Sequence, residues 1–100
     1  MKTQKQTPEI RRHSYKIVVK GKVQGVGYRF NAQAKAHQLD LTGFVKNSFD
    51  QTVLIHVEGK EESINQFIEW CYVGPRWADV SEVNAEEQEL MGYQTFEIKR

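Results

Sequence analysis

The sequence predicts an α+β domain in which an antiparallel sheet carries two helices on one face. Segments with the alternation of strands and segments with the periodicity of helices follow one another in the order β-α-β-β-α-β, with one short extra strand. A chain of 100 residues is long enough for one hydrophobic core and too short for two. This order of elements is that of the ferredoxin-like, split βαβ sandwich.

A strand, a glycine-rich turn and a helix make up the first part of this domain. Alternating apolar residues over 15–20 predict a strand with one well-buried face. Three glycines within 21–27 interrupt it. The helix predicted from Tyr28 ends at Asp40, and a single stripe of small or apolar side chains defines its buried face: Ala32, Ala36 and Leu39.

A hairpin, a second helix and two further strands make up the rest. The strands predicted over 44–47 and 53–58 are joined by the polar turn 48–51, and Gly59 is expected to stop the second strand. The next helix is predicted to start at a capping box of Ser63 and Gln66 and to end at Gly74. Its apolar side chains lie on one stripe: Ile64, Phe67, Ile68, Cys71 and Tyr72. Strands over 80–85 and 95–99 follow.

Composition excludes several classes of protein. With 14 basic against 13 acidic residues, the chain has no general attraction for nucleic acid or anionic lipid, and it contains no apolar stretch of membrane-spanning length. The single Cys71 forms no internal disulfide and is expected in the core, as are Trp70 and Trp77. We therefore expect a cytoplasmic monomer that binds neither nucleic acid nor membrane and contains no structural metal.

A flexible leader over residues 1–13 is predicted to precede the folded domain over 14–100. The leader carries four basic side chains against one glutamate and shows no hydrophobic periodicity.

The segment 21–29, Gly-Lys-Val-Gln-Gly-Val-Gly-Tyr-Arg, lies between the predicted strand and helix. Glycines there let several backbone N–H groups turn inward at the positive end of a helix, which makes an anion site. Arg29, in the first helical turn, can bind two phosphate oxygens with its guanidinium. The spacing matches neither a Walker loop nor a Rossmann fingerprint. The residues alone leave two interpretations open, a phosphate site or a glycine turn with a surface arginine.

The segment 21–29 resembles the first signature of the acylphosphatase family. The segment 43–47, Gly-Phe-Val-Lys-Asn, followed by Thr52, Val53 and Gly59, resembles the second. The resemblance covers roughly residues 14–100 and implies hydrolysis of a carboxyl–phosphate anhydride to a carboxylate and inorganic phosphate. Neither a cofactor nor a metal is expected, because Arg29 takes the part that Mg²⁺ usually plays in phosphoryl transfer.

The resemblance also assigns the site residues. Asn47 is expected to place the attacking water, and the side chain of Arg29 is expected to hold the phosphoryl group. Ser48 either lines the pocket and contacts Asn47 or only satisfies the local backbone. The alternative to a core position for Trp77 is a place near an acyl pocket. The expected substrate is a small-molecule acyl phosphate, with inorganic phosphate or sulfate as a product-like anion, and its phosphoryl group is expected on the backbone amides of the 24–29 loop: Gln24, Gly25, Val26, Gly27, Tyr28 and Arg29.

The chain departs from the family at Gln51, where a glycine usually stands in the hairpin turn. A glutamine held in the left-handed conformation costs about 1 kcal/mol. Alternatively, Asp50 takes the left-handed position and the turn shifts by one residue.

Two other functions compete with the enzyme. An RNA-recognition module needs exposed aromatic side chains and a basic sheet face, whereas the region 79–97 holds six acidic residues and no basic one. A protein that binds phosphate without hydrolysing it is the nearer alternative. The joint presence of Arg29 and Asn47 favours the enzyme, because a mere phosphate binder has no use for an amide that places water.

Overall fold

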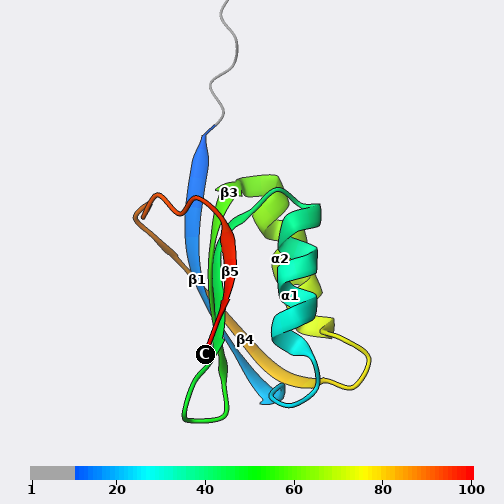
Figure 1. Cartoon of the computed structure of the whole chain (residues 1–100). Coiled ribbons are helices and arrows are strands. Elements are labelled where there is room, and N and C mark those ends of the chain that lie inside the picture. Colours follow the sequence, from blue (N-terminus) through cyan, green and yellow to red (C-terminus); the bar gives the residue numbers. More distant parts are fainter. Residues whose placement is uncertain (1–10) are drawn as a thin grey trace, which may run out of the picture.

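The computed structural model describes residues 11–100, which form a five-stranded sheet with two helices packed on one face (Figure 1). The order of strands across the sheet is β4-β1-β3-β2-β5. The predicted ferredoxin-like fold is confirmed, with one correction: β5 pairs parallel to β2, so the sheet is mixed rather than wholly antiparallel. The elements are β1 (Arg12–Lys22), α1 (Tyr28–Gln38), β2 (Thr42–Asn47), β3 (Val53–Lys60), α2 (Glu61–Val73), β4 (Asp79–Gln88) and β5 (Phe96–Lys99).

The first strand begins at Arg12, two residues before the expected start of the domain. Arg12 and His13 pair with Lys60 and Gly59 of β3, so the predicted boundary moves toward the N-terminus. The rest of the expected leader, residues 1–10, lies outside the described residues.

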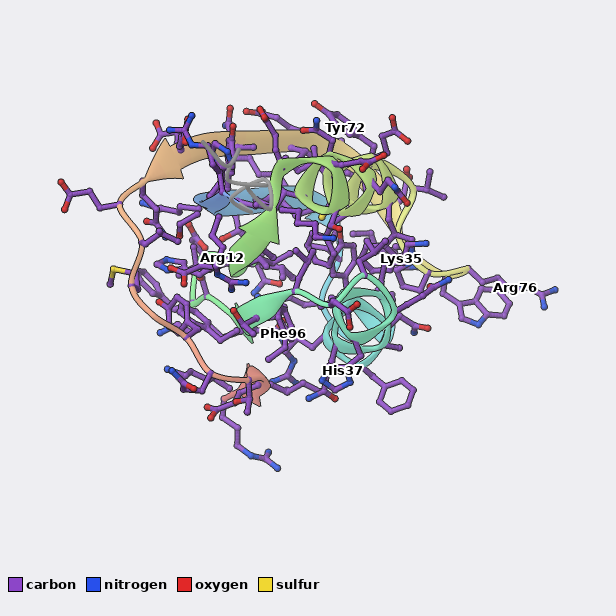
Figure 2. All side chains as sticks on the ribbon, turned by 90° about the horizontal axis from the view of Figure 1, so that it is seen from above. Arg12, Lys35, His37, Tyr72, Arg76 and Phe96 are labelled. Atoms are coloured by element: carbon purple, nitrogen blue, oxygen red, sulfur yellow. The ribbon has the colours of Figure 1, made fainter. Side chains whose placement is uncertain are left out.

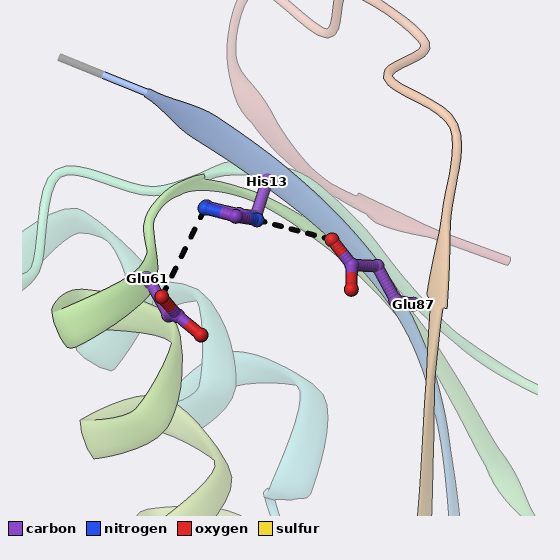
Figure 3. A network of polar contacts seen from close by, with 3 residues as sticks. All are labelled: His13, Glu61 and Glu87. Atoms are coloured by element: carbon purple, nitrogen blue, oxygen red, sulfur yellow. Dashed lines mark hydrogen bonds and ion pairs between the residues drawn. The ribbon is translucent and has the colours of Figure 1, made fainter.

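His13 links the start of β1 to two other elements (Figure 3). Its Nδ1 lies 3.0 Å from Oε2 of Glu87 on β4, and its Nε2 lies 3.9 Å from Oε1 of Glu61 at the start of α2. Both carboxylates are exposed to solvent, so each contact contributes on the order of 0–1 kcal/mol when the histidine is protonated.

The core lies between the sheet and the two helices. Most of the predicted stripe of α2 is buried there: Ile64, Phe67 and Cys71 are fully inaccessible and Ile68 is half-buried. The expectation for Tyr72 was wrong, because its side chain is 58% exposed. Burial raises the pKa of the Cys71 thiol to about 12, which makes it an inert core group. Trp70 is partly buried against this core, but the expectation for Trp77 was wrong: its side chain is 70% exposed, next to the guanidinium of Arg76.

Two boundaries around α2 differ from the prediction. The helix begins at Glu61, so Ser63 lies inside the first turn, and no side chain within residues 11–100 caps the helix there. Two glutamates in the first turn interact favourably with the helix dipole instead. Gly59 continues β3 rather than stopping it, and a Cβ at this position would lie 2.5 Å from Cδ2 of Leu41. The helix ends at Gly74 as predicted, with a φ of 70°.

The segment 89–95 crosses from one edge of the sheet to the other. It connects β4 to β5 on the side of the sheet away from the helices, as Figure 2 shows. The buried carboxylate of Glu58, on β3, accepts hydrogen bonds from the backbone N–H groups of Met91, Gly92 and Tyr93. Burial alone raises the pKa of Glu58, but these bonds and one from Ser14 outweigh it, so the pKa lies below its ordinary value.

We expect Glu58→Gln to lower the free energy of unfolding at neutral pH by about 1.5–3 kcal/mol, because a charged acceptor of buried N–H groups is lost. The advantage of the wild type is complete above the ordinary glutamate pKa of about 4.3, and it disappears as the pH falls through the lower pKa of the folded state. Denaturant unfolding at a series of pH values measures both effects, with Glu86→Gln on exposed β4 as the control. A deficit that stays constant down to the lowest pH would contradict this account of Glu58.

Candidate active site

The glycine-rich loop connects β1 to the first turn of α1. Gly25 and Gly27 have φ angles of 74° and 80°, values that side-chain-bearing residues rarely adopt. Gly27 occupies the N-cap of α1, and within the described chain no side chain caps this helix and no acidic residue lies in its first turn. The first N–H groups of a helix have no intrahelical partner, so this end of α1 can bind an anion.

A cavity of about 200 Å³ opens beside this loop. It brings Arg29 of α1 and Asn47, the last residue of β2, to one site. Four of its lining residues belong to the predicted phosphate loop: Gly25, Gly27, Tyr28 and Arg29. The others are the predicted Asn47 and three residues that were not predicted, Val23, Phe30 and Ile98. Three predicted site residues lie outside this lining: Gln24, Val26 and Ser48.

The side chain of Gln24 ties the loop to the β2–β3 turn. Its Nε2 donates to the backbone oxygens of Ser48 and Thr52, each at 2.8 Å. These bonds fix the turn that directly follows Asn47, so Gln24 positions the site with its side chain. Val26 is half-buried and packs against the core, and Ser48 donates its backbone N–H to the oxygen of Thr52.

The guanidinium of Arg29 is oriented by the last strand. Its Nη1 donates to the backbone oxygen of Lys99 on β5, at 3.0 Å. A guanidinium has five N–H donors, so this contact leaves donors for a ligand in the cavity. This contact could not be predicted from the sequence, because no local pattern indicates that the C-terminal strand lies beside α1.

Asn47 carries an unusual buried acceptor. Its Oδ1 is inaccessible to solvent and has no hydrogen-bond partner among residues 11–100. Leaving a buried acceptor unpaired costs about 1–3 kcal/mol, and such groups point to a bound water or ligand. Asn47 is itself one of the lining residues, so this acceptor belongs to a residue of the site.

The side chain of Tyr28 is a core anchor. Its hydroxyl donates to the backbone oxygen of Cys71 at 2.8 Å, and its ring lies 5.1 Å from that of Trp70. Burial raises the pKa of this phenol far above its ordinary value, so the hydroxyl is not ionised at neutral pH. Its contribution to a bound anion is limited to the backbone N–H.

The hairpin turn adopts the first of the two arrangements expected from the sequence. Gln51 itself takes the left-handed conformation, with a φ of 74°, so the alternative in which Asp50 does so is not adopted. The carboxylate of Asp50 accepts bonds from the hydroxyl and backbone N–H of Thr52, at 2.6 and 3.2 Å, and the hydroxyl bond contributes most to lowering its pKa. Asn47 consequently pairs in register with Val53.

We expect Gln51→Gly to raise the free energy of unfolding by about 0.5–1 kcal/mol, because glycine removes the strain of a positive φ but adds some backbone entropy to the unfolded chain. Denaturant unfolding of the two proteins measures this change. A decrease in stability would show that Gln51 makes a contact worth more than its strain.

Two further features bear on the class of protein. No helix within residues 11–100 is both long and apolar enough to cross a membrane. Nor does this part of the chain bring together three His, Cys, Asp or Glu side chains in a group that could hold a metal ion.

Comparison with known proteins gives one consistent result. The acylphosphatase family model matches residues 15–98. An acylphosphatase of Acaryochloris marina is 45% identical over 85 residues, which cover 85% of this chain and 91% of the relative. The structure of an acylphosphatase from Coxiella burnetii superimposes with a TM-score of 0.86 at 39% identity, covering 88% of this chain and 93% of that one. The crystal structure of the acylphosphatase from Bacillus subtilis gives a TM-score of 0.86 at 36% identity, covering 88% and 99%. This chain therefore belongs to the acylphosphatase family of enzymes, which act on small-molecule acyl phosphates.

Proposed function

We propose that the cavity holds the phosphoryl group of an acyl phosphate between the loop amides and Arg29, while Asn47 places the water that attacks phosphorus. The observation that carries this proposal is that Asn47, which lines the same cavity as Arg29, holds a buried Oδ1 that has no hydrogen-bond partner among residues 11–100. An orphaned acceptor beside an anion site suits a water molecule that donates one hydrogen to it.

The phosphoryl group is held by dipoles and one positive charge. The backbone N–H groups of the loop, from Gln24 to Arg29, and the positive end of α1 surround its oxygens. A cation at a helix N-terminus is disfavoured by about 0.3–1 kcal/mol, but a bound anion between Arg29 and the helix reverses this effect. Inorganic phosphate or sulfate is expected to compete for the same donors.

The chemistry needs placement and charge stabilisation more than acid–base help. The water oxygen forms a bond to phosphorus as the bond from phosphorus to the carboxylate oxygen breaks, giving a carboxylate and inorganic phosphate. The carboxylate is a good leaving group and needs no general acid. The proton of the water passes to a phosphoryl oxygen or to solvent, because the amide of Asn47 accepts a hydrogen bond but is too weak a base to take a proton.

Charge that develops on the phosphoryl oxygens is stabilised by Arg29, so the proposed reaction requires neither a metal nor a cofactor. The Tyr28 phenol has a raised pKa, and the other side chains in the cavity lining are glycine, apolar, amide or guanidinium groups. The proposed mechanism therefore predicts a kcat that is independent of pH between about 6 and 8.

Hydrolysis of acetyl phosphate in the presence of excess EDTA tests this proposal. We expect full activity with EDTA, no stimulation by Mg²⁺ and competitive inhibition by inorganic phosphate. Loss of activity in EDTA that Mg²⁺ restores would contradict the metal-free mechanism, as would a kcat controlled by a group titrating near neutral pH. A folded protein that binds phosphate without turnover would be a phosphate binder instead. The monomeric state and the cytoplasmic location stay predictions from composition.

A further inference from the structure

Two exposed apolar side chains border the cavity. Phe30, in the first turn of α1, is 69% exposed, and Ile98, on β5, is 38% exposed. Both are next in sequence to residues of the Arg29–Lys99 hydrogen bond. Phe30 directly follows Arg29, and Ile98 directly precedes Lys99, whose backbone oxygen accepts the bond from that arginine. Neither side chain belongs to the buried core cluster, so core packing does not explain why large apolar groups stand here.

In the proposed mechanism, the phosphoryl group and the attacking water occupy the polar part of the cavity. Gly25, Gly27 and the guanidinium of Arg29 face the phosphoryl group, and Asn47 faces the water. Val23 also lines the cavity but is itself buried. The Tyr28 side chain is committed to the core. The acyl group of the substrate is the remaining occupant, and among residues 11–100 the lining side chains left for it are Phe30 and Ile98.

We propose that Phe30 and Ile98 form an acyl subsite, which favours substrates with an uncharged apolar acyl group, above all an aromatic one. This inference rests on the proposed function, because it assumes that the phosphoryl group occupies the cradle. An aromatic acyl group that covers the exposed ring of Phe30 removes apolar surface of both from water. A methyl group, as in acetyl phosphate, covers much less of that surface.

The kinetic test compares benzoyl phosphate with acetyl phosphate. We expect Phe30→Ala to lower the ratio of their kcat/KM values about tenfold, mainly through the KM of benzoyl phosphate, while Phe30→Leu keeps most of the ratio. Phe49→Ala is the matched control, since this ring is fully exposed and lies outside the cavity lining, and it should leave the ratio unchanged. An equal loss for both substrates, or no loss, would overturn the subsite.

A binding test separates this inference from the proposed function, because phosphonates are not hydrolysed. We expect phenylphosphonate to bind the wild-type protein about tenfold more tightly than methylphosphonate, and Phe30→Ala and Ile98→Ala each to reduce this preference. If acyl phosphates were not turned over but the preference were present and sensitive to Phe30, the proposed function would fail and the subsite would stand. If turnover were normal and the preference absent, the subsite alone would fail.

Discussion

Replacing Arg29 with alanine is expected to lower kcat/KM for acyl phosphates by about a thousandfold or more, the range found for arginines that stabilise a transferred phosphoryl group. Arg29 is the one positively charged side chain that residues 11–100 contribute to the cavity lining, so the variant loses charge stabilisation in both the bound substrate and the transition state. Arg29→Lys keeps the charge but not the planar fork, and we expect it to recover less than about tenfold. Steady-state kinetics on the three proteins measures these changes.

Arg76→Ala is the control for this experiment. Arg76 is exposed, lies over the ring of Trp77 and projects away from the body of the protein in Figure 2. The free energy of unfolding of Arg29→Ala should fall by only about 1 kcal/mol, the value of its hydrogen bond to the oxygen of Lys99. A folded Arg29→Ala protein with nearly full activity would show that the phosphoryl group binds elsewhere.

Replacing Asn47 with alanine is expected to lower kcat about a hundred- to a thousandfold and to change KM by less than about threefold, because the water is placed in the transition state rather than in substrate binding. The stability of this variant should stay equal to that of the wild type or rise slightly. The substitution removes a buried acceptor that no other group within residues 11–100 satisfies. A loss of activity without a loss of stability is the signature of a residue kept for its chemistry.

The isosteric Asn47→Asp variant provides a second comparison. Its carboxylate repels the phosphoryl group, so we expect KM to rise as well as kcat to fall. Asn84→Ala, on exposed β4, is the control and should change neither constant. If Asn47→Ala unfolded at markedly lower denaturant concentration, its lost activity would reflect the turn rather than the water.

The elements with a clear local signal were predicted well. The buried face of β1 and most of the apolar stripe of α2 were predicted correctly, because the same side chains form the core, Ile17, Val19 and Phe67 among them. Boundaries that depend on a neighbouring strand were less accurate. Gly59 continues β3 because His13 pairs with it, and a local pattern around a glycine carries no information about a partner that lies far along the chain.

In the candidate site too, residues within a local motif were predicted, whereas contacts between distant segments were not. The glycine loop and Arg29 are contiguous in sequence, and their resemblance to a family signature located them together with Asn47. The contacts that position them join segments that are distant in the sequence. The side-chain amide of Gln24 donates hydrogen bonds to the hairpin turn, and the guanidinium of Arg29 donates one to the backbone oxygen of Lys99. Trp77 was expected in the core from its residue type, but the turn after α2 leaves it in solvent. These are consequences of tertiary packing, which one sequence does not display.

The most direct test of the mechanism is hydrolysis in water enriched in the heavy oxygen isotope, followed by mass spectrometry of both products. Attack on phosphorus by a water held at Asn47 places the label in inorganic phosphate and leaves the carboxylate unlabelled. Attack on the acyl carbon would place the label in the carboxylate instead. That result would contradict the assignment of the Gln24–Arg29 loop and Asn47 to phosphoryl transfer.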